Sequence, residues 1–158
     1  MERVEWCDTI IHQFPVYWWS LPAVHKGWLD RILAYYWAYG GGKKALAGKR
    51  WMLSATIGGP TSIYMNGNAP FVGMSNVHDL MQPFNYATPV MLGCQRIPMW
   101  FVGGVGRKTP DERAAIADEL VAHLRVYLTG SLKEADLPRP VHSASLPDGD
   151  DGHEHGHA

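Results

Sequence analysis

Hydrophobic and polar positions along the chain alternate between strand-like and helix-like patterns. Apolar runs rich in β-branched and aromatic residues predict three strands, over residues 8–14, 50–56 and 97–102. Apolar residues at helical spacing predict helices over residues 20–36, 75–92 and 109–130. Strands that alternate with helices are typical of an α/β fold, in which parallel strands are joined by right-handed crossovers.

The clearest helix boundary is the stretch from Thr109 to Glu112. Thr109 is a favourable N-cap, Pro110 suits the first helical position, and Glu112 completes a capping box. Gly130 is expected to end this last helix. At the first helix, Ser20 is the expected N-cap.

The middle helix is predicted to be irregular. Ser75 is its expected N-cap, and Gly93 is expected to close it. Pro83 and Pro89 lie inside it and should kink or split it, because proline lacks the backbone N–H that the helix needs.

Composition indicates one globular domain followed by a polar tail. The chain has 158 residues, of which 46% are hydrophobic, and a net charge of −1 offers no basic surface for nucleic acid. No apolar run approaches the ~20 residues of a membrane span. Pro, Ser, Asp, Gly and His dominate the end of the chain, so we predict a folded domain over 1–137 and a disordered, His-rich tail over 138–158.

Neither the cysteines nor the histidines predict a metal site. Cys7 and Cys94 lack metal-ligand spacing and indicate a reduced, cytoplasmic protein. The histidines near the C-terminus can chelate transition metals in a flexible chain, although we interpret them as a weakly metal-binding end without a role.

Two loops follow predicted strands and carry the candidate chemistry. Residues 13–23 hold three consecutive aromatic side chains after a proline, and Gly58-Gly59 follow the next strand. In open α/β sheets, ligands bind outside the carboxyl ends of the strands. A flat ligand would cover aromatic rings at such a place, and glycines let the backbone approach it closely.

These loops belong to a longer run of motifs, QFPVYWWSLPAVHKGWLDR, then WAYG, ALAGK and TIGG followed by a tyrosine. In this order they resemble the flavodoxin-like NAD(P)H:quinone oxidoreductases. That family includes the DT-diaphorases, the modulators of drug activity and the ancillary oxidoreductases of potassium-efflux systems. The similarity covers about Asp8 to Leu128.

The resemblance implies a homodimeric flavoenzyme with a parallel sheet. It would bind FMN or FAD, take a hydride from NAD(P)H and reduce a quinone or similar acceptor, and a membrane transporter is a possible partner. The implied catalytic residues are Tyr64, Gly58 and Gly59. The implied cofactor-binding residues are Pro15, Val16, Tyr17, Trp18, Trp19, Thr56, Ile57, Gly58, Gly59 and Tyr64.

Three departures from the family bear on these expectations. The strand, phosphate-binding loop, helix and second strand that open the family fold do not precede residues 8–14. We therefore expect a flavodoxin-like sandwich that is incomplete at its N-terminus, through truncation or a misplaced start at Met1, and a first strand left at an open edge. No histidine follows Tyr64 over residues 68–71, and Ile57 stands where a threonine is common.

The absent phosphate loop favours an alternative interpretation. The chain would then be a truncated, non-catalytic dimerisation or regulatory protein of a transport system. The sequence does not distinguish NADH from NADPH or FMN from FAD.

Overall fold

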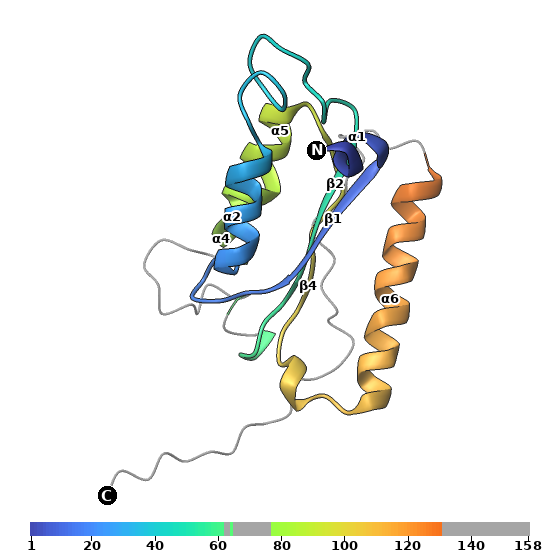
Figure 1. Ribbon diagram of the computed structural model, residues 1–158. Coiled ribbons are helices and arrows are strands. Elements are labelled where there is room, and N and C mark those ends of the chain that lie inside the picture. Colours follow the sequence, from blue (N-terminus) through green and yellow to red (C-terminus); the bar gives the residue numbers. More distant parts are fainter. Residues whose placement is uncertain (62–63, 65–76, 131–158) are drawn as a thin grey trace, which may run out of the picture.

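The computed structural model describes residues 1–61, 64 and 77–130. It has a parallel sheet with helices on both faces, which confirms the predicted α/β class (Figure 1). The elements are α1 (Glu2–Trp6), β1 (Thr9–Pro15), α2 (Ala23–Ile32), β2 (Arg50–Thr56), α4 (Val77–Leu80), the π-helix η1 (Pro83–Ala87), α5 (Thr88–Leu92), β3 (Gln95–Arg96), β4 (Trp100–Val102), the 3-10 helix η2 (Val105–Arg107) and α6 (Pro110–Thr129).

β2 is the central strand of this sheet. β1 pairs with it in parallel over its whole length, from Thr9 opposite Arg50 to Pro15 opposite Thr56. β3 and β4 both pair with the other side of β2, one after the other. The single strand predicted over 97–102 is therefore wrong in its extent, because Pro98 has no backbone N–H to donate and interrupts the ladder between β3 and β4.

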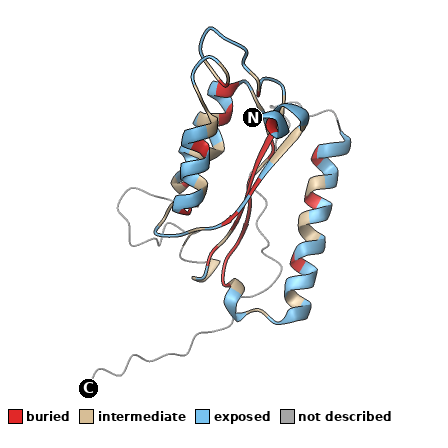
Figure 2. Ribbon diagram, viewed as in Figure 1, coloured by how far each residue is buried: buried red, intermediate tan, exposed pale blue. Residues whose placement is uncertain are grey.

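The side chains of β2 point alternately into two hydrophobic clusters, one on each face of the sheet. Trp51 and Leu53 belong to the cluster that α2 and α5 cover, whereas Met52 packs with Ile116 and Tyr127 of α6. Figure 2 shows the buried residues gathered along the strands and on the sheet-facing sides of the helices. A strand buried on both faces explains the continuous apolar run of its sequence.

β1 lies at the edge of the described sheet. Its burial alternates, so that His12 is 3% exposed and Ile11 is 41% exposed. Among the described residues, β1 pairs with β2 alone.

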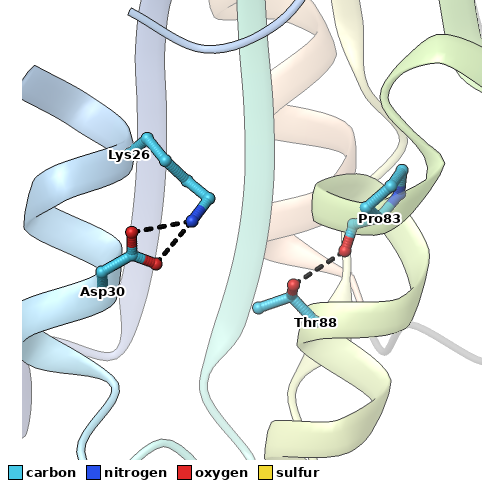
Figure 3. Close-up of polar contacts among 4 residues, drawn as sticks. All are labelled: Lys26, Asp30, Pro83 and Thr88. Carbon is cyan, nitrogen blue, oxygen red and sulfur yellow. Dashed lines mark hydrogen bonds and ion pairs between the residues drawn. The ribbon is translucent and has the colours of Figure 1, made fainter. Parts of the chain in front are cut away.

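The helix predicted over residues 20–36 is α2 in the structure, and it is shorter than predicted. It begins at Ala23 after the N-cap Pro22 and ends at Ile32, rather than running from Ser20 to Tyr36. Ser20 fails as a cap because its backbone groups pair with Tyr17. Lys26 and Asp30 form an ion pair on its exposed side, with a shortest N–O distance of 2.6 Å (Figure 3).

The middle helix is split, as its prolines predict. Pro83 begins η1 and Pro89 lies in the first turn of α5, while Gly93 ends α5 in a left-handed conformation at φ 73°. The Thr88 hydroxyl donates to the Pro83 carbonyl at 2.7 Å, which supports the join between the two pieces (Figure 3). The expected cap Ser75 lies outside the described residues.

The last helix follows its sequence signals. The Glu112 N–H donates to the Thr109 hydroxyl at 3.3 Å, and the Thr109 N–H donates to the Glu112 carboxylate at 2.6 Å. α6 runs to Thr129, and Gly130 is its C-cap. The predicted tail and its boundary at residue 138 lie outside the described residues.

α1 was not predicted. Lys49 holds its C-terminal end against the start of β2 by donating to the carbonyls of Glu5 at 2.8 Å and Cys7 at 2.5 Å. The Glu5 carboxylate in turn accepts from the Trp37 indole at 2.6 Å and pairs with Lys43 at 2.7 Å. A helix of five residues without a side-chain cap leaves almost no local signal in a sequence.

Candidate functional site

The parallel strands β1, β2 and β4 end at the same edge of the sheet, the lower edge in Figure 1. The Val16 N–H donates to the Thr56 carbonyl at 2.8 Å, and the Ile57 N–H donates to the Val102 carbonyl at 2.9 Å. The aromatic loop after β1 and the glycine loop after β2 therefore lie beside each other. This is the edge at which open α/β sheets bind ligands.

A strained turn follows β1. Tyr17 and Ser20 exchange both backbone hydrogen bonds at 3.0 Å, and between them Trp18 and Trp19 have φ values of 46° and 65°. Two successive positive φ angles are typical of a type I′ turn, which prefers Asn-Gly. The left-handed conformation costs a residue with a Cβ about 1–2 kcal/mol. Strain of this kind collects at functional sites.

The two tryptophans of this turn differ in their surroundings. Trp18 is 93% exposed, whereas Trp19 is partly buried against Tyr64, with 5.1 Å between ring centroids and 35° between ring planes. The Tyr64 ring also packs near the ring of Phe101 in β4, with 5.9 Å between the ring centroids. The phenol of Tyr64 is protonated at neutral pH at its ordinary pKa of 10.0, which burial raises further, and it can donate a hydrogen bond.

The space in front of Gly58 is open. A Cβ built at this residue meets no atom within 4 Å, and Gly58 itself is exposed. Within the described part of the chain, the N–H groups of Trp18, Gly58 and Gly59 donate to no backbone carbonyl. Open space beside Gly58, next to N–H groups that no described backbone carbonyl accepts from, suits a flat ligand with polar atoms at its edge. The isoalloxazine ring of a flavin is such a ligand.

The structure does not bring every predicted residue to this open edge. Ile57 is 3% exposed and packs in the core, so its side chain faces away from the loops. The N–H groups of Ile57, Val16 and Tyr17 are already bound to carbonyls. The missing threonine hydroxyl at position 57 is therefore of little consequence here, and the donors that remain belong to Trp18 and the glycines.

A third loop at this edge was missed by the sequence reasoning. Gly103 and Gly104 follow β4, and the Gly104 N–H donates to the Gly59 carbonyl at 2.7 Å. A Cβ at Gly103 would lie 2.5 Å from the Thr61 hydroxyl and 2.7 Å from its backbone nitrogen. This packing fixes the glycine loop after β2. A Gly-Gly pair directly after a strand was the signal that could have identified it.

A groove of about 380 Å³ lies elsewhere, between β1 and α2. It is lined by Ile10, Ile11, His12, Val24, His25 and Trp28. The His25 ring of α2 shares a hydrogen bond with the His12 ring of β1. His12 is buried, and its Nε2 has no hydrogen-bond partner among the described residues.

No group of three or more His, Cys, Asp or Glu side chains comes together within the described ranges. No described helix is both long and apolar enough to cross a membrane. Residues 68–71 and the His-rich tail lie outside the described residues, so their predicted roles stay predictions.

Curated relatives of this chain include several oxidoreductases. General stress protein 14 of Bacillus subtilis (strain 168) is 33% identical over 118 residues, 75% of this chain and 65% of that protein. The uncharacterized NAD(P)H oxidoreductase YdeQ of the same organism is 31% identical over 74% of this chain and 57% of its own length. NAD(P)H dehydrogenase (quinone) 1 of Rattus norvegicus is 30% identical, with coverages of 74% and 43%. The chain therefore spans less than two thirds of the length of these relatives.

Several solved structures are similar to this chain, and their names differ. A thermophilic tryptophan halogenase from Streptomycin violaceusniger has a TM-score of 0.70 and 31% identity over 83% of this chain and 72% of its own. General stress protein 14 of Treponema denticola, in complex with FMN, has a TM-score of 0.64 and 27% identity, with coverages of 81% and 68%. An NADPH-quinone reductase from P. pentosaceus has a TM-score of 0.66 and 25% identity, with coverages of 84% and 73%.

A family profile matches more of this chain than the curated relatives named above do. The profile described as flavodoxin-like fold matches residues 1–128, which include every described strand and all but the end of α6. The chain belongs to the flavodoxin-like fold family.

Proposed function

We propose that this chain forms the ring-binding part of a flavin-dependent NAD(P)H oxidoreductase that reduces a quinone or a similar acceptor. The observation that carries the proposal is the pair of adjacent loops after β1 and β2, with open space beside Gly58 and, among the described residues, three N–H groups that donate to no backbone carbonyl. Relatives named NAD(P)H oxidoreductase and NADPH-quinone reductase support the same activity. A bound flavin would supply the chemistry, by accepting two electrons as a hydride from NAD(P)H and passing them on.

The residues at the edge would orient the ring and stabilise its charge. The N–H groups of Trp18, Gly58 and Gly59 can donate to its polar atoms, which carry more negative charge after reduction. The protonated Tyr64 hydroxyl can donate to the same charge at neutral pH, and burial raises its pKa further above neutrality. Tyr17 and Pro15 are both exposed beside these donors and would border the ring.

FMN is the flavin that we favour. A relative of known structure contains FMN, and this chain is 27% identical to it. The residues assigned above contact the ring only, which FMN and FAD share, and we assign none to the phosphate. We keep the predicted cytoplasmic location, with which the two free thiols agree, and homodimerisation stays part of the proposal.

A non-catalytic binding role is the second candidate. Among the described residues, no strand pairs with the outer edge of β1, and an apolar groove lies beside it. Both features favour this role, because unpaired strand edges readily pair with another chain. In that case the loops would be retained as a dimerisation or regulatory surface, for example on a membrane transporter.

A fluorescence titration separates the two candidates. FMN and FAD would each be added to the purified chain and to the Gly58→Val variant. Saturable quenching of FMN fluorescence that Gly58→Val weakens would support the enzyme. Equal and non-saturating quenching by both proteins would contradict it and favour the binding role.

A further inference from the structure

Trp19 occupies a backbone conformation that its residue type does not favour. Its φ of 65° follows the 46° of Trp18, within a turn that Tyr17 and Ser20 close by mutual hydrogen bonds. Glycine or asparagine would adopt this conformation with less strain. Unlike the exposed Trp18 beside it, Trp19 is partly buried, and its indole makes a ring contact.

That contact is the ring of Tyr64. The two centroids lie 5.1 Å apart with 35° between the planes, a tilted stack within the range of favourable aromatic pairs. On its other side, Tyr64 contacts Phe101, which is buried in β4 and fixed by the sheet. Among the described residues, ring contacts rather than a hydrogen bond to the hydroxyl hold Tyr64 in place.

The two contacts come from different parts of the fold. Phe101 belongs to the core, whereas Trp19 belongs to the exposed aromatic loop that follows β1. The direction of the Tyr64 phenol therefore depends on the turn that presents Trp19. Trp18, the other tryptophan of the turn, is too exposed to share this role.

We propose that Trp19 is a positioning residue: the strained turn holds its indole against the Tyr64 ring and thereby fixes the phenol at the edge of the ring-binding site. The inference rests on the proposed function for the role of Tyr64, but the packing that it describes does not require a flavin. Trp19 acts through Tyr64 and not on the reacting atoms.

A titration without flavin tests the packing. The Tyr64 phenol would be titrated by ultraviolet difference spectroscopy. Subtracting the titration curve of Tyr64→Phe from that of the unmodified chain isolates the signal of Tyr64 from those of the other tyrosines. In Trp19→Gly, which suits the positive φ, the Tyr64 pKa should fall toward its ordinary value of 10.0, because the phenol loses its cover. Trp19→Phe should keep it raised, and Trp6→Phe, an exposed control on α1, should not change it.

A kinetic cycle tests the consequence for hydride transfer. Flavin reduction by NADPH would be followed in a single turnover for Trp19→Gly, Tyr64→Phe and the double variant. We expect each single variant to lose about tenfold in rate, the double variant to lose no more, and Trp19→Phe to recover most of the loss. Losses that multiply in the double variant would overturn the proposal, because the two residues would then act independently.

The results of the two experiments can contradict two different proposals, the positioning role of Trp19 and the ring-binding function. An unchanged Tyr64 pKa in Trp19→Gly overturns the positioning role whatever the flavin does. If the wild-type chain binds no flavin, the ring-binding proposal fails, and the titration alone decides whether Trp19 positions Tyr64. Trp19→Asn, which also tolerates a left-handed backbone, replaces Trp19→Gly if that variant does not fold.

Discussion

His12 of β1 and His25 of α2 share a hydrogen bond of 2.9 Å between Nδ1 and Nε2, beneath the groove that separates the strand from the helix. Such a bond needs at least one neutral ring, since two imidazolium rings have no acceptor. Burial, together with the charge of His25, lowers the pKa of His12 to about 3, and burial also lowers the pKa of His25. Both histidines therefore prefer to be neutral in the folded chain.

This pair predicts a loss of stability in acid. Above the ordinary histidine pKa of 6.5, neither state binds these protons and the stability is at its full value. As the pH falls from 6.5 toward 3, the unfolded chain takes up protons that folded His12 does not. The free energy of unfolding then falls by up to about 1.4 kcal/mol per pH unit on account of His12.

Urea denaturation at several pH values measures this slope, with His12→Leu as the variant that removes the buried ring. We expect a shallower dependence between pH 6 and 4 in the variant. His78→Gln serves as the control for loss of a histidine elsewhere, on α4. Equal slopes for the wild type and His12→Leu would contradict the assignment.

Replacing Trp18 by asparagine should stabilise the chain. Trp18 has φ 46° and is 93% exposed, so its side chain contributes little packing while its backbone is strained. Asparagine tolerates the left-handed conformation, and we expect a gain of about 1 kcal/mol in the free energy of unfolding. Trp6→Asn, also at an exposed tryptophan but in a helix, should give no gain. A loss of stability in Trp18→Asn would show that the indole has a packing role.

Two glycines at the same edge should respond in opposite ways to a larger side chain. Gly58→Val should fold with near-native stability, because open space surrounds its Cβ position, and should weaken FMN binding at least about tenfold by crowding the ring. Gly103→Ala should instead destabilise the fold, because its Cβ would lie 2.5 Å from Thr61. Thermal melts and FMN titrations of both variants measure these effects, and unchanged FMN affinity in Gly58→Val would remove this loop from the site.

The cap of α6 should affect stability without affecting the site. Thr109 accepts a hydrogen bond from the Glu112 N–H, so Thr109→Ala should cost about 1 kcal/mol of unfolding free energy. Thr109→Ser keeps the hydroxyl and should retain most of the stability. FMN affinity should be unchanged in both variants, and a parallel loss of affinity would mean that α6 also shapes the ring-binding edge.

Local signals predicted those parts of the fold that local chemistry determines. The apolar run of β2 and the capping box at Thr109 depend on neighbouring residues, and both are confirmed. Ser20 was assigned as a cap because serine is a favourable one, yet its backbone is committed to the turn with Tyr17. Pro98 divides the third strand, an effect that the apolar run around it concealed.

The sequence suggested where the candidate site lies but not its detailed geometry. Loops after parallel strands pointed to the edge of the sheet at which we propose the site, and the family resemblance singled out Tyr64. The left-handed tryptophans contradict their intrinsic preference, so no propensity argument could have found them. The contact of Trp19 with Tyr64 joins residues that are far apart in sequence, and such pairs depend on the tertiary fold.

The proposed flavin chemistry is tested by an anaerobic visible absorption spectrum of the purified chain with FMN, recorded before and after addition of NADPH. We expect a perturbed spectrum of bound flavin that bleaches when NADPH is added and recovers when a quinone follows. A flavin that stays in its free form, or that binds without bleaching, would contradict it.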